Sequence, residues 1–387
     1  MNSFADFDLH PELKLSLQAL DFTLPTPIQK QAIPMALQGL DLIAGAQTGS
    51  GKTVAFAIPI LQRLLNKPEA VALILVPTRE LAEQVSEVFK DLLKFSPQMR
   101  VANLIGGLSM RPQVQLLTLK PQVIVATPGR MMDHLRRKNV KLGKLEVLVL
   151  DEADRMLDMG FADQLNEILS FLPEQRQTLL FSATLPKHIM ELSGRYLKNP
   201  QRVQVQSTQE TRPQIEQQSL EVPNARKNET LLEQVGQREG SILVFARTQI
   251  RTTRIVKYLK EYGFHCAVIH GGRTQGQRKE ALDRFRQGSV RVLIATDIAA
   301  RGLDISHVAH VINYDLPQDP ADYVHRIGRT ARAGRSGTAM SFVTPEEKRI
   351  WEKISRQFQP QKPRESGHKG FRTLKKPAYE VIEDLKV

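Results

Sequence analysis

The chain has 387 residues, more than one hydrophobic core usually serves, since cores stop growing at about 250–300 residues, so two domains are expected. Hydrophobic residues make up 41% and charged residues 25%, and no uncharged apolar run approaches the roughly 18 residues of a membrane helix, which excludes a membrane-embedded chain. Lys and Arg outnumber Asp and Glu by 54 to 41, and this net charge of +13 favours a polyanionic partner such as nucleic acid.

The first half alternates short β-rich apolar runs with longer helical patterns, an order typical of βαβ units that build a parallel sheet. Helices such as Val54–Leu65 and Glu80–Leu93 are expected between the strands. The predicted strands are, in chain order, Asp41–Ala44, Val71–Val76, Val101–Ile105, Val123–Ala126, Val147–Leu150, Thr178–Phe181 and Arg202–Val205. The fold class is therefore predicted to be α/β.

The composition changes at Gln204–Gln218, which is rich in Gln, Ser, Thr and Glu and is typical of an interdomain linker. A second set of predicted strands follows it: Ile242–Phe245, Cys266–Ile269, Val290–Ala295, Val308–Asn313 and Ala339–Val343. The predicted organisation is an N-terminal domain 1–206, a linker 207–217, a C-terminal domain 218–345, and a helical extension with a basic tail 346–387. Because both halves share one plan, two similar domains are expected to face each other across a cleft.

The basic tail is the most strongly charged segment. Lys353–Lys376 holds eight basic residues against one acidic residue, a net charge of +7, with several Pro and Gly and few apolar side chains. Such a composition predicts a flexible segment that does not fold alone. It either tethers a polyanion or only keeps the chain soluble.

A phosphate-binding loop is the sharpest local motif. It follows an apolar strand, opens a helix and reads Ala46-Gln47-Thr48-Gly49-Ser50-Gly51-Lys52-Thr53. Glycines let backbone N–H groups approach a triphosphate, and the amino end of the helix favours negative charge. Lys52 is expected to reach the β and γ phosphates, and the Thr53 hydroxyl to ligate Mg²⁺.

An acidic run, Asp151-Glu152-Ala153-Asp154, follows the strand Val147–Leu150, at the edge where open α/β sheets bind ligands. Asp151 is expected to hold the metal ion, usually through water, and Glu152 to orient and deprotonate the attacking water. Alone, the run is also an ordinary first turn of a helix, where acids suit the helix dipole. The preceding phosphate loop favours the metal site.

Further motifs extend this order along the chain: Pro77-Thr78-Arg79-Glu80-Leu81, Thr127-Pro128-Gly129-Arg130, Ser182-Ala183-Thr184 and His325-Arg326-Ile327-Gly328-Arg329-Thr330-Ala331-Arg332. With the acidic run they closely resemble the DEAD-box ATP-dependent RNA helicases, over about residues 4–345. The resemblance implies two tandem RecA-like domains, each a mostly parallel sheet flanked by helices, that bind ATP, Mg²⁺ and single-stranded RNA across the cleft.

The resemblance also implies roles for residues around the nucleotide. Gln29 would hydrogen-bond adenine, with Phe22 and Phe4 beside the base, although core packing is the alternative for both rings. The resemblance also implies that Asp304 contacts the nucleotide. Asp21 and Ala331 stand where relatives usually have Gly.

The resemblance implies that other residues couple ATP hydrolysis to the second domain and to bound RNA. Arg329 and Arg332 resemble arginines that reach the γ phosphate, and His325 is expected to bridge to the acidic run. Asp154, Ser182 and Thr184 would link the nucleotide site to RNA. The RNA contacts implied by the resemblance are Pro77, Thr78, Arg79, Gly106, Gly107, Thr127, Pro128 and Arg130 in the first domain, and Gly271, Gly272, Thr296 and Asp297 in the second.

The resulting prediction is an RNA-stimulated ATPase that closes its domains on ATP and RNA and locally unwinds short duplexes or remodels RNA–protein complexes, without processive movement. An ATP-gated RNA clamp that does not unwind, and a DNA-translocating helicase, remain alternatives. The first ten residues lack the layout of a secretory signal and Cys266 is the only cysteine, which favours a reducing cytoplasm or nucleus, with the cytoplasm the location that we predict. The core is expected to be monomeric.

Overall fold

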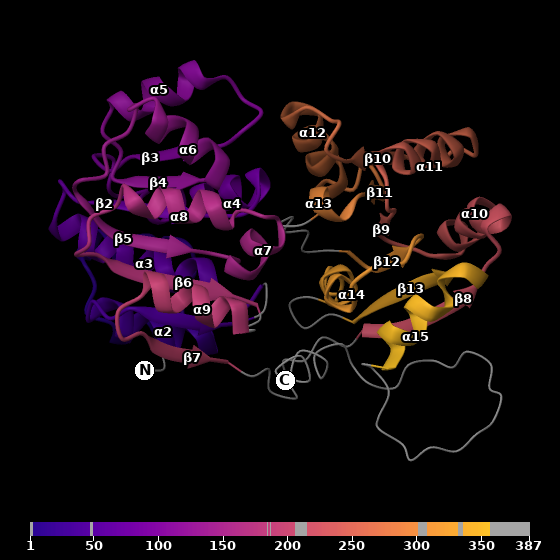
Figure 1. Cartoon of the computed structure of the whole chain (residues 1–387), viewed down its shortest axis with the longest axis horizontal. Helices are drawn as coiled ribbons and strands as arrows, with labels where there is room; N and C mark the ends of the chain where they lie inside the picture. Colours follow the sequence, from indigo (N-terminus) through magenta and orange to yellow (C-terminus); the bar gives the residue numbers. More distant parts are fainter. Residues whose placement is uncertain are drawn as a thin grey trace, which may run out of the picture. The chain divides into compact units, whose positions relative to one another are not determined.

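The computed structural model describes residues 3–46, 49–183, 185, 187–205, 215–300, 308–331 and 336–356. It divides into two compact units, residues 1–206 and 207–387 (Figure 1). Each unit is a parallel sheet flanked by helices, so the predicted α/β class is confirmed. Among the described helices, none has the length and apolar character needed to cross a membrane.

The first unit contains a seven-stranded sheet in the order β3-β4-β2-β5-β6-β1-β7, in which every paired strand is parallel. Its strands are β1 Leu42–Gly45, β2 Val71–Leu75, β3 Val101–Leu104, β4 Val123–Ala126, β5 Leu145–Leu150, β6 Gln177–Ser182 and β7 Gln201–Gln204. All seven predicted strands are confirmed, with boundaries that differ by at most two residues.

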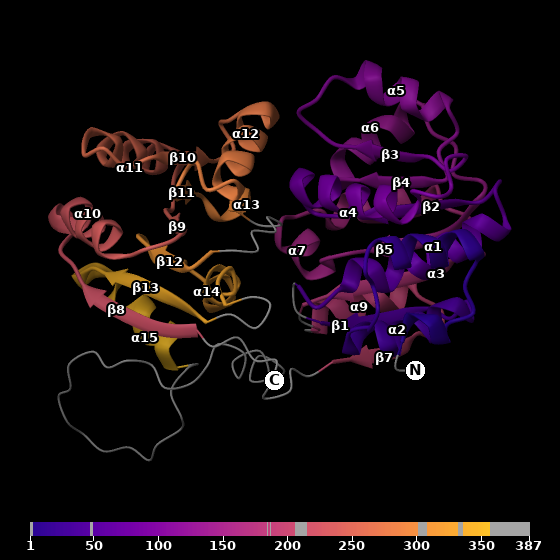
Figure 2. The same ribbon diagram turned by 180° about the vertical axis from the view of Figure 1, so that it is seen from behind.

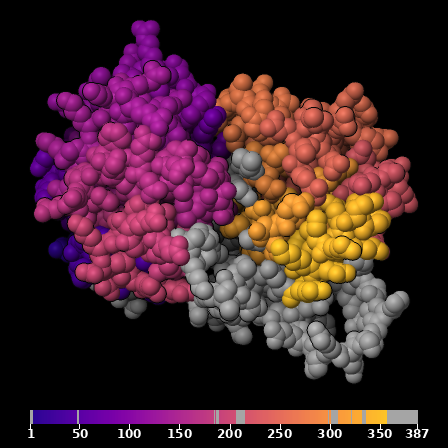
Figure 3. Space-filling model, viewed as in Figure 1, coloured from indigo at the N-terminus to yellow at the C-terminus, as the bar shows by residue number. Residues whose placement is uncertain are grey.

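Helices cover both faces of this sheet. They are η1 Phe4–Asp6, α1 Pro11–Ala19, α2 Pro27–Leu37, α3 Lys52–Asn66, α4 Arg79–Leu92, α5 Met110–Thr118, α6 Pro128–Arg136, α7 Ala153–Asp158, α8 Ala162–Ser170 and α9 Lys187–Tyr196. Apolar residues of α1–α4 pack with one set of strand side chains, and those of α5–α9 pack with the alternate set. Figures 1 and 2 show the two layers from opposite sides, and Figure 3 shows the magenta face formed by α6, α8 and α9. The strands are therefore buried on both faces, which explains their continuous apolar runs.

The second unit contains a six-stranded sheet in the order β10-β11-β9-β12-β13-β8, also parallel throughout. Its strands are β8 Ile215–Glu221, β9 Ile242–Phe245, β10 Cys266–Ile269, β11 Val292–Ala295, β12 His310–Asn313 and β13 Gly337–Val343. Its helices are η3 Asn224–Arg226, α10 Lys227–Gln237, α11 Gln249–Glu261, α12 Gln275–Arg286, α13 Asp297–Ala300, α14 Pro320–Ile327, η4 Pro345–Glu347 and α15 Lys348–Arg356. α10 and α11 pack on one face, and α12–α15 pack on the other.

One strand was not predicted. β8 pairs with β13 from Ile215 to Glu221, so the interpretation of Gln204–Gln218 as a linker is wrong for its last residues. β8 lies at the edge of the sheet and five of its seven residues are polar, because most of its side chains do not enter the core. Gln204 itself ends β7. The basic tail beyond Arg356 lies outside the described residues.

Candidate functional site

The phosphate loop joins β1 to α3 in the first unit. Gly49 and Gly51 have φ angles of +85° and +92°, a left-handed backbone that glycine adopts without strain. Gly51 precedes the 15-residue helix α3, which begins at Lys52, and Thr53 is the half-buried second residue of that helix. Ala46 is buried at the carboxyl end of β1, where its N–H donates to Ser182 O at 3.0 Å. Gln47 and Thr48 lie outside the described residues.

Two polar groups of this loop are buried without a hydrogen-bond partner among the described residues: Lys52 Nζ and Ser50 Oγ. A buried ammonium group without a hydrogen-bond partner is costly, so Lys52 fits a site that binds an anion. The left-handed glycines, the helix amino end and Lys52 together fit the phosphates of a nucleotide.

The acidic run begins where β5 ends, beside the phosphate loop. Asp151 is buried, and burial raises its pKa to about 6 although the positive charge of Lys52 opposes the rise. A buried carboxyl near Lys52 of the phosphate loop fits a hard cation such as Mg²⁺, which takes oxygen ligands. Glu152 has a φ of +52°, a strained backbone for a residue with a side chain, of the kind that occurs at functional sites.

Sequence reasoning missed the partner of Glu152. Its Oε2 accepts from Arg155 Nη1 at 2.7 Å, and both side chains are buried. The i,i+3 spacing on the short helix α7 was the available signal. The pair fixes the orientation of the carboxylate that the sequence assigns to the attacking water.

Asp154 lies at the other end of the same turn. Its Oδ2 accepts from Ala183 N at 3.1 Å, so the acidic run is tied to the loop after β6. Ser182 is the buried last residue of β6. Thr184 lies outside the described residues, and the bond to Ala183 is the recorded link between these two motifs.

Gln29 packs directly against the phosphate loop. Its Nε2 donates to Gly51 O at 3.0 Å, and its Oε1 accepts from Thr26 N at 2.8 Å. A methyl group on Gly51 would lie 2.5 Å from Gln29 Nε2, so a side chain here would displace the Gln29 amide as well as strain the backbone. Each end of the amide keeps one further hydrogen-bonding capacity, which is what reading adenine would use.

The aromatic residues before Gln29 form a small cluster. Phe4 is buried against Phe22, with ring centroids 5.9 Å apart, and Phe22 is half-buried. Core packing thus accounts for Phe4. Asp21 has a φ of +55°, in the left-handed region that Gly would occupy without strain.

A cationic corner lies at the same sheet edge of the first unit. Arg79, the first residue of α4, covers Gly106 and Gly107, and a methyl group on Gly107 would lie 2.0 Å from Arg79 Nη1. Arg130 Nη2 donates to Leu108 O at 3.1 Å, whereas its Nε and Nη1 are buried without a hydrogen-bond partner among the described residues.

Burial lowers the pKa of Arg130, and the charge of Arg79 adds to this effect while Asp133 opposes it. Two neighbouring guanidinium groups fit an anion such as a backbone phosphate, although Arg130 Nε also lies 3.7 Å from Asp133 Oδ2. Pro77 and Thr78 precede α4, where Thr78 Oγ1 accepts from Leu81 N at 3.3 Å. Thr127 and Pro128 open α6, the helix that carries Arg130.

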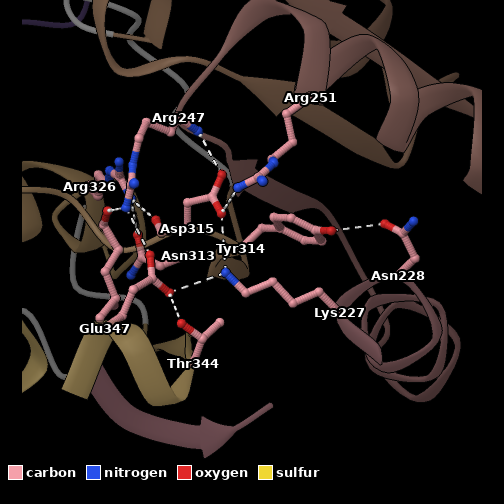
Figure 4. Close-up of polar contacts among 11 residues, drawn as sticks. Lys227, Asn228, Arg247, Arg251, Asn313, Tyr314, Asp315, Arg326, Thr344 and Glu347 are labelled. Atoms are coloured by element: carbon pink, nitrogen blue, oxygen red, sulfur yellow. Dashed lines mark hydrogen bonds and ion pairs between the residues drawn. The ribbon is translucent and has the colours of Figure 1, made fainter. Parts of the chain in front are cut away.

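In the second unit, Arg326 hydrogen-bonds several residues at the carboxyl edge of the sheet. It binds both carboxylate oxygens of Asp297, at 2.5 and 2.7 Å. It also donates to Asn313 Oδ1 and to Asp315 O (Figure 4). Arg326 therefore binds the Asp297 carboxylate, and the role of Asp297 in RNA binding stays a prediction. Thr296 is buried, and its N–H donates to Ile269 O at 3.3 Å, whereas Gly271 and Gly272 are exposed.

A buried charge cluster lies beside Arg326 (Figure 4). Asp315 accepts from Lys227 Nζ at 3.1 Å and from Arg251 Nη1 at 2.6 Å, and Glu347 accepts from Lys227 and Arg247. Burial would raise the pKa of Asp315, but the Arg247 backbone amide, Lys227 and Arg251 outweigh it and hold the pKa below its usual value. The cluster joins the carboxyl ends of β9 and β12 to α10 and η4.

Two of the remaining predicted residues, His325 and Arg329, lie on α14 or just after it. His325 is half-buried on this helix, and Arg329 is buried just beyond its end. Ala331 has a φ of +55°, so a side chain occupies a left-handed position that Gly fills without strain. Arg332 and Asp304 lie outside the described residues.

Comparisons with known proteins agree with these motifs. The DEAD/DEAH box helicase model matches residues 26–192, and the helicase conserved C-terminal domain matches residues 226–334. The DEAD-box ATP-dependent RNA helicase CshA of Bacillus cereus is 44% identical over 349 residues, which are 90% of this chain and 66%, just under two thirds, of the relative.

Two further relatives cover more of their own length. The ATP-dependent rRNA helicase rrp3 of Sclerotinia sclerotiorum is 46% identical over 91% of this chain and 74% of its own. The solved structure of Dbp5 from S. cerevisiae, bound to RNA and ADP BeF3, is 35% identical, covers 92% of this chain and 93% of its own, and has a TM-score of 0.81. The chain therefore belongs to the family of DEAD-box ATP-dependent RNA helicases.

Proposed function

We propose that this chain is an ATP-dependent RNA helicase whose hydrolysis of ATP is stimulated by RNA. The observation that carries the proposal is Lys52 Nζ, which is buried beside Asp151, without a hydrogen-bond partner among the described residues, at the end of a loop with left-handed glycines. Its relatives of similar length are RNA helicases by name, and Dbp5 was solved with RNA.

In this proposal Thr53 and Asp151 hold Mg²⁺, which neutralises phosphate charge when it is bound. Lys52 binds the β and γ phosphates, and Gln29 selects adenine. Glu152, oriented by Arg155, positions the attacking water and accepts its proton. Arg329 and Arg332 supply positive charge to the γ phosphate from the second unit.

Stimulation of hydrolysis by RNA follows because the catalytic residues are divided between the two units. Lys52 and Glu152 belong to the first unit and Arg329 to the second, so hydrolysis requires the units to close on ATP, and RNA that binds both units favours closure. Each closure disrupts a few base pairs, which makes unwinding local and non-processive. We place this activity in the cytoplasm, with a monomeric core and with single strands and short duplexes as substrates.

Strand displacement at saturating ATP, with a trap for the released strand, tests the proposal. Duplexes of about one helical turn should separate, and the yield should fall steeply beyond about one and a half turns, since each base-pair step costs on the order of 1–2 kcal/mol. RNA-stimulated hydrolysis without any strand release would favour the clamp instead. Equal separation of duplexes several turns long would contradict local opening, and stronger stimulation by DNA than by RNA would favour a DNA helicase.

A further inference from the structure

The first unit contains a buried histidine outside the helicase motifs. His134 lies on α6, one turn after Arg130, and its side chain is fully buried. α5 and α6 lie side by side on one face of the sheet (Figures 1 and 2), and His134 Nε2 is 3.3 Å from Gln113 Oε1 of α5. Asn139 Nδ2 lies 3.3 Å from the other ring nitrogen, Nδ1. Both nitrogens of the imidazole therefore have a partner.

The hydrogen bonds around this histidine can run in only one direction. Gln113 Nε2 contacts two backbone carbonyl oxygens, Ile105 O at 3.1 Å and Ser109 O at 3.2 Å, which only accept hydrogen bonds. The nitrogen of the amide faces these carbonyls, so its oxygen faces His134 and needs a donor there. His134 therefore carries its proton on Nε2 and accepts from Asn139 Nδ2 at Nδ1.

The surroundings of the ring favour this neutral form. Burial lowers the pKa of His134, and the nearby charges of Arg130 and Arg137 add to this effect. Asp133 opposes it. A neutral imidazole donates at one nitrogen and accepts at the other, which is what the chain of hydrogen bonds requires.

This chain of hydrogen bonds ends on the loop after β3, residues 105–109, which includes the glycine pair expected to contact RNA. Arg130 holds the same loop directly, because its Nη2 donates to Leu108 O at 3.1 Å. His134 holds the loop through Gln113. Since Arg130 and His134 both belong to α6, this helix fixes the loop at two points.

We propose that His134 is a positioning residue for RNA binding, which acts through Gln113 to hold the loop 105–109 against α6. RNA contacts are expected both from this loop and from the first turn of α6, so the spacing of the two segments must match the spacing of groups along one RNA backbone. His134 is itself fully buried and contacts no RNA. The inference rests on the proposed function, because it presupposes that the chain binds RNA.

The test is RNA affinity of the full chain, measured by fluorescence anisotropy with a labelled oligouridine of about ten nucleotides and a non-hydrolysable ATP analogue. His134→Phe keeps an aromatic ring but cannot donate to Gln113, and it should weaken RNA binding roughly three- to tenfold. His134→Gln still carries an N–H donor and should bind RNA within about twofold of the wild type. Nucleotide affinity in the absence of RNA should not change in either variant.

A double-mutant cycle checks that His134 acts through Gln113. Gln113→Met keeps a side chain of similar length but releases the two loop carbonyls, so it should weaken RNA binding at least as much as His134→Phe. In the Gln113→Met background, His134→Phe should have no further effect on RNA affinity. Gln113→Met releases the loop by itself, so it also carries the test if His134→Phe does not fold.

A matched control makes the same substitution in the second unit. His310 begins β12, at the amino edge of the sheet, and its ring nitrogens hydrogen-bond Thr338 Oγ1 at 2.6 Å and Glu239 O at 2.8 Å. His310→Phe should lower the free energy of unfolding, as His134→Phe should, but it should leave RNA affinity at the wild-type value.

Three outcomes overturn the inference. Equal RNA affinities of His134→Phe, His310→Phe and the wild type would leave His134 with a structural role only. Equal weakening by His134→Phe in the wild-type and Gln113→Met backgrounds would show that His134 does not act through Gln113. Both results leave the proposed function intact, whereas a wild-type chain that binds no RNA would contradict the proposed function itself, and the inference with it.

Discussion

Glu152 combines a strained backbone with a buried ion pair to Arg155, which together fix its carboxylate. Glu152→Gln keeps the shape but removes the base, so ATP should still bind while hydrolysis slows about 10²- to 10⁴-fold. Single-turnover phosphate release and nucleotide titration measure the two effects. Glu69→Gln, an exposed change at the amino end of β2, is the control. Hydrolysis by Glu152→Gln at the wild-type rate would remove Glu152 from its assigned role.

Lys52 gives a second prediction because its ammonium group is buried without a hydrogen-bond partner among the described residues. Lys52→Met should not lower the free energy of unfolding in the absence of nucleotide. ATP with Mg²⁺ at about 100 times the dissociation constant should stabilise the wild type by about 2.7 kcal/mol and the variant by far less. Thermal unfolding with and without nucleotide measures both. Equal stabilisation of the two proteins would exclude Lys52 from the nucleotide site.

From residue spacing, the positions of the candidate residues could be predicted, but most of the contacts that these residues make could not. The loop Ala46–Thr53 and the acids after β5 could be found because strand, turn and helix signals are local. Arg155 was missed because an arginine on a short helix also reads as a surface residue, and its burial depends on tertiary packing. For the same reason the pairing of the Asp297 carboxylate with Arg326, almost thirty positions away, was not predicted.

At the scale of elements, the apolar strands were predictable because parallel sheets bury both faces and leave short uninterrupted runs. β8 was not, because Ile215–Glu221 is a polar edge strand whose pairing with β13 depends on residues more than a hundred positions away. The repeat of strand order between the units became visible only once β8 was included.

The buried cluster that joins α10, β9, β12 and η4 supports a third prediction. Lys227→Met would leave Asp315 and Glu347 without their shared partner, so the free energy of unfolding of the second unit should fall by about 3 kcal/mol. Arg226→Met next to it removes only an exposed pair and should cost less than about 1 kcal/mol. Urea unfolding of both variants checks the contrast. Equal losses would mean that the cluster does not stabilise this unit.

The pH dependence of this effect has a definite sign. The folded pKa of Asp315 is lowered, so its stabilisation is present above the ordinary Asp pKa of about 4 and is lost as pH falls through the folded pKa. The difference in unfolding free energy between Lys227→Met and wild type should therefore shrink between about pH 7 and pH 3. A difference that grows on acidification would contradict the assigned pairing.

At the scale of the whole molecule, the tail predicts how RNA binding depends on salt. Most of the net charge of +7 in Lys353–Lys376 lies beyond the described residues, in a segment expected to release counterions when RNA binds. Deleting residues after Pro360 should weaken RNA binding and flatten its salt dependence, and ATP hydrolysis at saturating RNA should persist. Overlapping titrations of both chains at two salt concentrations would instead indicate a segment that only keeps the chain soluble.

The central claim is that the nucleotide site of the first unit is incomplete until RNA brings the arginines of the second unit to it. Steady-state phosphate release at saturating ATP and Mg²⁺, with and without single-stranded RNA, tests it most directly. The expected result is a rate that rises at least about tenfold with RNA, with the rise abolished in Arg329→Ala, since arginines in this role contribute 10³-fold or more. Equal rates with and without RNA in the wild-type chain would contradict the claim.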